Sequence, residues 1–545
     1  MNFSVKGVQK VLRVDNISMP LQYTDRELTQ KVAGLLRISP DTIRSVRLYR
    51  RAIDSRGEVR YVLSVLVSAE GESRILHRSR DKNVSKAEKQ HYSLPLLSAA
   101  PALPPVVVGA GPAGLFAALL LAEAGARPIL LERGRKVEER QADVQKFFQT
   151  GVLDPFSNVQ FGEGGAGAFS DGKLNTLTKD PRHRYILHKL VDFGAPEEIL
   201  YDAKPHVGTD KLRSVLVAMR AYLAARGADI RFSSHLTDIT VKDGAISSIT
   251  VTSPEGRCTL PCEHLILAPG HSARDTFAML YEKGLSMEAK PFAVGVRIEH
   301  KQSEMDAQQY REAAGNPALP ASSYKLSCHL PNGRGVFSFC VCPGGEVVAA
   351  ASEEGRLVTN GMSEFARDKE NINGALLVSV TPEDFGGEGP LAGIAFQRKL
   401  ERDAFLAGGG GYAAPAQLVG DFLAGKPSAA AGHIAPSYRP AVHFTDLRAC
   451  LPPFIADSLR EALPLLDKKL PGFAAKDAVL TAVESRSSSP VRILRNENGV
   501  SSVRGLYPAG EGAGYAGGIL SAAADGMRQA EALLTDYAAK EHFHD

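Results

Sequence analysis

The stretch that decides the fold is Val106-Val107-Val108-Gly109-Ala110-Gly111-Pro112-Ala113-Gly114. A short β-branched run is followed at once by a G-x-G-x-x-G turn and then by an apolar helical segment over 115–124. After Gly125, a second apolar strand is predicted over 128–131. A glycine-rich turn between a strand and a helix, inside such a β-α-β unit, is typical of a dinucleotide-binding site.

Each residue of this turn has a physical role. Gly109 permits the tight turn, Gly111 lets the backbone approach a pyrophosphate, and Gly114 lets the helix pack closely on the strand. Pro112 and Ala113 open the helix, whose N-terminal N–H groups and positive dipole end favour phosphate. We therefore predict that all five residues bind the cofactor.

Glu132 is predicted to bind the adenosine ribose. It lies 23 residues after Gly109, close to the offset of roughly 20 residues expected of that acid. Its carboxylate would repel a 2′-phosphate, so NADP is not expected at this site. Arg133, the next residue, is included in the predicted cofactor-binding set.

Length and composition indicate a globular protein of several domains. The chain has 545 residues, of which 44% are hydrophobic and 23% charged, with a net charge of +3. Two or three domains are expected at this length. No apolar run is long enough to span a membrane, and residues 1–14 lack the apolar core of a signal peptide. A cytoplasmic location is expected, and no metal site is predicted.

The first 95 residues are predicted to form a basic α+β module. They hold 18 Lys and Arg against 10 Asp and Glu. Strands are expected over 11–17, 43–49 and 61–67, and Thr24 with Glu27 predicts a capping box at the start of a helix. Prolines crowd the stretch 94–105 and indicate a domain boundary there.

The six cysteines are predicted to be reduced. Cys340-Val341-Cys342 would place both thiols on one face of a strand, where parallel side chains cannot easily form a disulfide. No C-x-x-C pattern occurs, so disulfide chemistry is not the leading expectation. A redox or metal role for these cysteines stays open as an alternative.

A second glycine-rich segment, residues 160–173, is predicted to be a loop that lies against a flat or anionic ligand, because its glycine content disfavours a helix or strand. We expect it to contact the cofactor through Gln160, Gly164, Gly165, Ser170 and Asp171. Lys173 could neutralise a negative charge on the cofactor, although a solvated loop lysine is an equal alternative. The four glycines at 408–411 are instead interpreted as an ordinary loop.

Two more turns complete the pattern. A buried strand over 265–267 ends in a turn at Gly270, and a strand near 506 is followed by Gly510, Glu511 and a glycine-rich bend. Gly517, Gly518 and Ile519 then open a final helix. This order resembles the glutathione-reductase-type FAD fold, an α/β class in which a Rossmann-like FAD domain is assembled from discontinuous segments around an inserted mixed α/β substrate domain. It implies an N-terminal module (1–95), an FAD domain (104–280 and 476–545) and an inserted domain (281–475).

A closer resemblance covers nearly the whole chain. Residues 158–165, 170–175, 270–275, 342–346 and 484–492 are similar to those of a bacterial family of uncharacterised FAD-dependent dehydrogenases. The resemblance implies that Glu511 accepts a hydrogen bond from a ribityl hydroxyl of FAD, and that the last helix directs its N-terminal amides at the flavin. We therefore expect FAD as the cofactor.

The predicted function is an FAD-dependent oxidoreductase that acts on an unidentified small organic substrate. Candidate catalytic residues are Arg486, Tyr515, His271 and Lys173. Arg486 could hold an anionic substrate, as could Arg492, and structural salt bridges are an equal alternative for both. Tyr515 and His271 could donate a proton. The electron donor is expected to be NAD(P)H or a reduced redox partner. A flavin-dependent monooxygenase is one alternative. A nucleic-acid-associated flavoprotein is the other, because a basic module supplies phosphate affinity.

Overall fold

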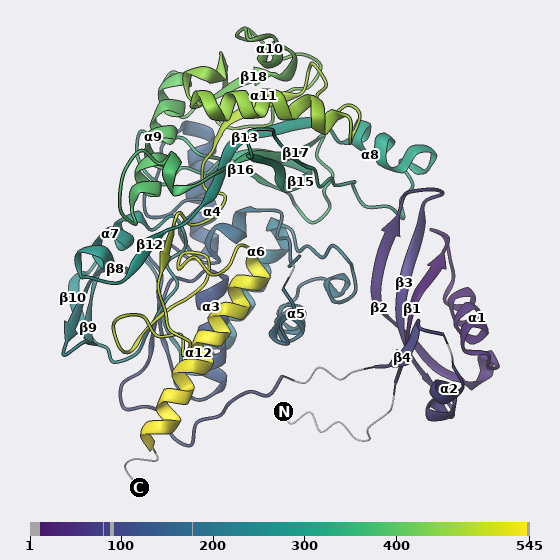
Figure 1. Cartoon of the computed structure of the whole chain (residues 1–545). Helices are drawn as coiled ribbons and strands as arrows, with labels where there is room; N and C mark the ends of the chain where they lie inside the picture. Colours follow the sequence, from purple (N-terminus) through teal and green to yellow (C-terminus); the bar gives the residue numbers. More distant parts are fainter. Residues whose placement is uncertain (1–10, 80, 88–91, 177, 542–545) are drawn as a thin grey trace.

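The computed structural model describes residues 11–79, 81–87, 92–176 and 178–541 of the chain. A large body contains most of the elements, and the N-terminal module stands beside it (Figure 1). Within these residues, no helix combines the length and the apolar character needed to cross a membrane.

A parallel five-stranded sheet forms one half of the body. Its strands come from well-separated parts of the chain in the order β22 (Leu506–Pro508), β11 (Leu265–Leu267), β5 (Val106–Val108), β6 (Ile129–Leu131) and β7 (Asp229–Arg231). The three strands β22, β11 and β5 are buried along their whole length. Because the strands are parallel, their carboxyl ends and the glycine turns that follow lie at one edge of the sheet.

Two helices pack together against this sheet, α3 (Pro112–Glu123) and α12 (Ile519–Glu541) (Figure 1). Their contact is close at Gly526, where an added Cβ would lie 1.9 Å from the Ala113 carbonyl oxygen. The C-terminal helix is therefore held against the helix of the first glycine turn. The other helices of this half are α4 (Val137–Thr150), α5 (Arg182–Asp192), α6 (Thr209–Ala225) and α7 (Arg274–Glu282).

A small antiparallel sheet extends this half with β8 (His235–Lys242), β9 (Ala245–Ser253) and β10 (Gly256–Pro261), and a separate ribbon pairs β12 (Met287–Ala289) with β21 (Val491–Ile493).

The other half of the body is built on a mainly antiparallel eight-stranded sheet. Its long central strands are largely apolar and buried. Its order is β14 (Ser327–His329), β15 (Gly335–Ala349), β17 (Asn371–Val380), β13 (Phe292–Lys301), β20 (Val479–Glu484), β18 (Ala414–Leu418) and β19 (Val442–Phe444), with β16 (Thr359–Met362) paired to β15. Its helices are α8 (Gln302–Tyr310), α9 (Ala392–Ala407), α10 (Val419–Ala424) and α11 (Pro453–Asp467). The run 408–411 follows α9 as a loop, as predicted.

The N-terminal module is an antiparallel sheet with two helices. The sheet order is β2 (Ile43–Asp54), β3 (Arg60–Ala69), β1 (Leu12–Met19) and β4 (Val84–Lys86), with α1 (Asp25–Leu36) and α2 (Glu72–Arg78) beside it. The predicted capping box is confirmed, since Thr24 and Glu27 each accept the other's backbone N–H. The expectation that residues 50–60 separate two strands is wrong in part. β2 continues to Asp54 because its basic residues pair with β3.

The module contacts the body through Arg51. Its guanidinium donates to both carboxylate oxygens of Asp202, at 2.8 and 3.2 Å, and its backbone N–H donates to the Tyr201 carbonyl at 2.7 Å. Arg44 and Arg56 pair with carboxylates inside the module. Part of the basic character is therefore used in internal and docking ion pairs, and nucleic-acid binding stays a prediction.

Candidate functional site

A single cavity collects most of the predicted cofactor-binding residues at the carboxyl edge of the parallel sheet. Those that line it are Gly109, Gly111, Pro112, Ala113, Glu132, Arg133, Gln160, Gly165, Ser170, Gly270, Glu511, Gly517, Gly518 and Ile519. The turns that follow β5, β11 and β22 touch one another there. An added Cβ at Gly109 would lie 2.1 Å from the Ala268 oxygen, and one at Gly512 would lie 2.6 Å from the Gly270 oxygen.

The glycine-rich segment 160–173 is held in place by Arg140. This side chain is fully buried, and burial lowers its pKa to about 10, so it stays charged at neutral pH. Its guanidinium donates to backbone carbonyls just before the segment, those of Asn158 and Val159, and within it, those of Gly162, Glu163 and Gly165. This one buried cation therefore fixes the backbone of a segment that its glycines alone would leave flexible. Residues 165–169 form a short 3₁₀ helix there, which the sequence did not predict.

Glu132 ties the same segment to the first glycine turn. Its carboxylate accepts the backbone N–H groups of Ala110 at 2.7 Å, Gly134 at 2.9 Å and Gly162 at 2.9 Å. A carboxylate has about four acceptor positions, so one remains for a ligand hydroxyl. Glu132 lines the cavity and fits a ribose there, while it also orders the protein backbone.

The cavity leaves room for a ligand beside two helix N-termini. An added Cβ at Gly111, the N-cap of α3, has no neighbour closer than 3.8 Å, and one at Gly517, just before α12, has none within 4 Å. Neither α3 nor its N-cap carries a side chain that satisfies the first N–H groups. Unsatisfied amides at the start of a helix bind anions. The residues present therefore fit a dinucleotide whose phosphates lie at α3 and whose far end lies at α12.

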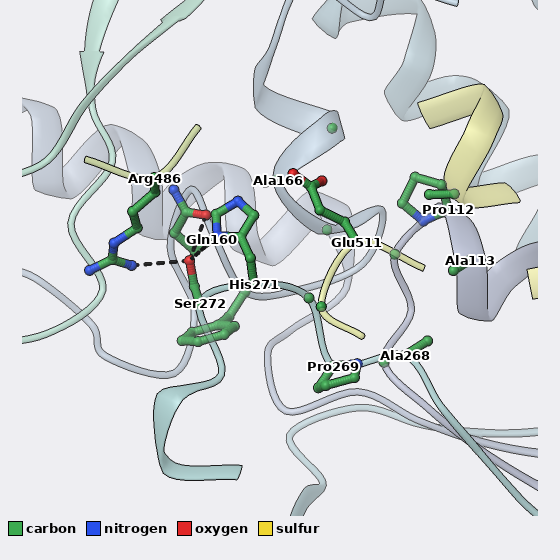
Figure 2. A pocket seen from close by; sticks show the side chains of 18 of the residues that line it. Pro112, Ala113, Gln160, Ala166, Ala268, Pro269, His271, Ser272, Arg486 and Glu511 are labelled. Carbon is green, nitrogen blue, oxygen red and sulfur yellow. Dashed lines mark hydrogen bonds between the residues drawn. The ribbon is translucent and has the colours of Figure 1, made fainter. Parts of the chain in front are cut away.

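Glu511 faces this cavity from the turn after β22 (Figure 2). Among the described residues, none donates a hydrogen bond to its carboxylate. Burial raises its pKa to about 7, with Lys290 opposing the shift and Cys340 adding to it. A partly buried acceptor that has no protein donor is suited to a ligand hydroxyl, which fits the predicted ribityl contact.

Glu511→Gln should change how the stability of the FAD-free protein depends on pH. The folded-state pKa of Glu511 is raised from 4.5 to about 7, so its contribution to stability is fully present below pH 4.5 and is lost as the pH rises through 7. Glutamine does not ionise. The melting temperature of the variant, relative to the parent, should therefore rise between pH 5 and 8 and level off above. Parallel melting curves across this range would contradict the shifted pKa.

The opposite end of the cavity is polar and lies against the eight-stranded sheet. Ser272 is at its centre (Figure 2). Its hydroxyl donates to the Gln160 side-chain oxygen at 3.0 Å, lies 3.1 Å from His271 Nδ1, and accepts from Arg486 Nη1 at 3.1 Å. These four side chains come from three distant parts of the chain and form one hydrogen-bonded group.

Arg486 lines the cavity, but the structure corrects its predicted role as a free anion clamp. Its Nε and Nη2 donate to Glu401 at 2.9 and 2.8 Å, and its Nη1 donates to Ser272 and Ser352. Arg274 donates to both oxygens of the same Glu401 carboxylate. Because Glu401 already occupies the fork of Arg486, this guanidinium cannot hold a substrate carboxylate bidentately.

His271 also lines the cavity. Burial, together with the charges of Arg486 and Arg274, lowers its pKa to about 3. The imidazole is therefore neutral at neutral pH. It can share a hydrogen bond with Ser272, but it cannot act there as the imidazolium acid that the sequence suggested.

Four predicted cofactor contacts do not reach the cavity, because tertiary packing uses them elsewhere. Gly114 packs α3 on the turn, since an added Cβ would lie 1.8 Å from the Gly109 oxygen. Gly164 lies against Leu216. The buried carboxylate of Asp171 pairs with Arg367, and the Gly510 N–H donates to Asp525 at 2.8 Å. These residues shape the site and do not line it.

Two predicted catalytic residues are likewise outside the cavity. The Lys173 ammonium donates to the Val341 carbonyl. Tyr515 stacks under Arg495, with the guanidinium carbon 3.7 Å from the ring centroid, and its hydroxyl accepts the Arg495 N–H at 3.2 Å. Arg492, a second suggested anion-binding residue, pairs with Glu288 at 3.1 Å.

Two ionisable groups at the polar end of the cavity were not predicted from the sequence, Glu484 and Cys340. Glu484 ends β20, and its carboxylate accepts from the fully buried Arg297 at 3.1 Å. Burial raises the pKa of Glu484 to about 7, although Arg297 opposes the shift. In the sequence, the signal for Glu484 is its position as an isolated acid at the end of the apolar run 479–484.

Comparison with known proteins agrees with this site. Residues 103–279 match an FAD binding domain, residues 291–487 match the C-terminal domain of an FAD-dependent protein, and residues 12–68 match a domain of unknown function. An uncharacterized protein of Clostridium beijerinckii is 47% identical over 531 residues, which is 96% of this chain and 99% of that protein.

Solved structures of flavoproteins are more distant. A flavin-dependent brominase is 12% identical with a TM-score of 0.38, over 80% of this chain and 79% of its own. A geranylgeranyl bacteriochlorophyll reductase-like protein of Thermoplasma acidophilum is 12% identical with a TM-score of 0.35, over 80% and 79%. The assignment therefore depends on the domain matches and the clostridial relative. The cofactor is FAD, and the chain belongs to a bacterial family of uncharacterised FAD-dependent proteins.

Proposed function

We propose that this flavoprotein transfers hydride or electrons between non-covalently bound FAD and a small organic substrate. The observation that carries the proposal is the continuous cavity, which joins the first glycine turn to a polar end walled by Ser272, Glu484 and Arg486. The first end suits the nucleotide handle of FAD. The second supplies protein donors and acceptors where a substrate could meet the cofactor.

The residues of the FAD end would bind and orient the cofactor. The N-termini of α3 and α12 supply amides to the phosphates and to the flavin edge, where they would stabilise negative charge. Glu511 would accept a ribityl hydroxyl, and Glu132 a ribose hydroxyl. When bound, FAD supplies the hydride and electron transfer.

The residues of the polar end would position the substrate and move a proton. Glu484 has a pKa of about 7, close to the value that suits a general acid or base at neutral pH. We propose that its carboxyl group exchanges a proton with the substrate. Ser272, which accepts a hydrogen bond from Arg486, would donate its hydroxyl proton to the substrate once its bond to Gln160 is exchanged.

The electron donor would be NAD(P)H or a reduced redox protein that binds transiently. G-x-G-x-x-G patterns occur at 109–114, 162–167 and 512–517. The first lies in a β-α-β unit between β5 and β6, with Glu132 directly after β6, and the FAD end of the cavity uses that unit. A donor nucleotide would therefore approach the polar end from outside.

The purified protein should be yellow, with the visible bands of oxidised FAD, and anaerobic NADH or NADPH should bleach them. The nucleotide that bleaches faster names the donor. Oxygen-dependent incorporation of a hydroxyl into a product would instead favour the monooxygenase alternative. A colourless protein that cannot be reconstituted with FAD would overturn the proposal.

A further inference from the structure

Cys340 and Cys342 lie where β15 departs from regular strand geometry. The register with β17 shifts between Phe339 and Cys342, and Cys340 adopts a φ of 41°. A non-glycine residue in this left-handed region is strained and is often found at a functional site. The regular strand geometry on which the prediction of two parallel thiols depends is therefore absent at Cys340.

The two cysteines differ in their access to the cavity. Cys340 lines the cavity and is partly exposed, whereas Cys342 is buried. The Cys342 Sγ lies 3.4 Å from the Cys340 carbonyl oxygen. An accessible thiol can attack a disulfide ligand and form a mixed disulfide. A buried thiol beside it can then displace the ligand and form a disulfide within the protein.

Two cations hold this segment through its backbone carbonyls. Arg297 Nη2 donates to the Cys340 carbonyl at 2.9 Å and lies 3.6 Å from the Cys342 Sγ. Lys173, from the glycine-rich segment, donates to the Val341 carbonyl between the two cysteines. A hydrogen bond from Cys342, together with the charges of Lys173 and Arg297, places the pKa of Cys340 well below its usual value, while the pKa of Cys342 is raised. Reactive thiols sit in such electropositive, partly exposed surroundings.

We propose that Cys340 and Cys342 form a redox-active dithiol that exchanges with a small disulfide substrate at the polar end of the FAD cavity. This inference deepens the proposed function and rests on it, because a reduced flavin is the class of reductant that would return the pair to the dithiol. It gives Lys173 and Arg297 a positioning role beside the cysteines.

The exchange balances without another reactant. The Cys340 thiolate attacks one sulfur of the disulfide R–S–S–R, so that a Cys340–S–S–R bond forms and RS⁻ leaves. The Cys342 sulfur then attacks Cys340 Sγ and displaces the second R–S group, which departs with the Cys342 proton as RSH. The substrate disulfide gains two electrons, and the two cysteines lose them as their disulfide forms.

The test uses the FAD-loaded full chain and the aromatic disulfide dithiobis-nitrobenzoate as the probe. Cys258 is exposed, so every protein carries Cys258→Ser to remove its reaction. With the pair intact, each chain should release two coloured thiolates, and its intact mass should fall by two hydrogens with no probe attached. In Cys342→Ser, each chain should release one and retain one probe group.

Three further variants separate the pair from other thiols and from misfolding. Cys340→Ser should slow the release about tenfold or more, because the reactive thiolate is lost. Lys173→Met should slow it by a smaller factor while both cysteines remain. Cys328→Ser removes a buried cysteine of the neighbouring strand β14 and should react like the parent.

Two results would overturn the proposal. The first is that Cys340→Ser releases the probe thiolate at the parent rate. The second is that the parent chain keeps a probe group on Cys340. FAD content and NAD(P)H bleaching are measured on the same preparations. A yellow, nucleotide-reducible protein without dithiol exchange would refute the dithiol alone. A protein that binds no FAD would refute the proposed function.

Discussion

Gly111→Val should bind FAD more weakly than the parent and should fold like the FAD-free parent. The added side chain enters space that the protein itself leaves open, since even an added Cβ has no neighbour closer than 3.8 Å. Gly111 has an extended backbone, with φ −78° and ψ −179°, which valine adopts readily. The ligand must then accept the extra methyl groups, at a cost of about 1–3 kcal/mol. That cost weakens FAD binding by about 5- to 150-fold.

The measurements are FAD occupancy by absorbance, the dissociation constant by titration of stripped protein, and the melting temperature with and without FAD. Gly114→Ala is the matched control from the same turn. Its added Cβ would lie 1.8 Å from the Gly109 oxygen, so it should lower the melting temperature even without FAD. If Gly111→Val bound FAD as tightly as the parent, the phosphates would not lie at this turn. If Gly111→Val destabilised the FAD-free protein as much as Gly114→Ala does, the space beside Gly111 would be required for packing of the protein itself and not for the cofactor.

Glu401→Gln should be the most destabilising single substitution in the polar half of the site. The Glu401 side chain is fully buried between the two buried guanidiniums of Arg274 and Arg486. Burial alone raises the pKa of Glu401, but the charges of Arg274 and Arg486 outweigh it, and the pKa lies well below its usual range. Removal of this charge leaves two buried cations near one another, and breaking a buried pair costs about 3–5 kcal/mol.

Thermal unfolding at neutral pH measures this loss. Because the pKa of Glu401 is depressed, its contribution is present above the unfolded-state pKa, near 4.5, and is lost only in strong acid. Glu353→Gln is the matched control, because Glu353 also pairs with Arg274 but its side chain is 25% exposed. It should cost about 1 kcal/mol or less. Equal effects of the two substitutions would mean that burial does not decide the strength of these pairs.

Several features could be predicted from the sequence because nearby residues determine them. The glycine turn after β5 depends on positions within one β-α-β unit, and the Thr24 capping box depends on residues three positions apart. The turn at Gly270 and the acid Glu511 follow their strands directly. These residues line the cavity as expected, since a parallel sheet brings the carboxyl ends of its strands to one edge.

Other features could not be predicted because their partners lie far away in the chain. Lys173 and Asp171 belong to the same glycine-rich segment as Gly165, yet contacts with Val341 and Arg367 draw them out of the cavity. Arg486 has the sequence context of an anion-binding residue. Only the position of Glu401 on α9 shows that the Arg486 guanidinium already binds a carboxylate of the protein. No local pattern records these distant contacts.

The sequence by itself therefore determined the class of ligand, because a dinucleotide handle is bound by backbone geometry that short-range glycine spacing encodes. The tertiary structure decided what the polar end can do. In the folded protein, Glu401 pairs with Arg486, and burial keeps His271 uncharged. Cys340 lies in the cavity wall at an irregular position of β15. Charge state and accessibility depend on neighbours supplied by the whole fold, and residue identity alone does not specify them.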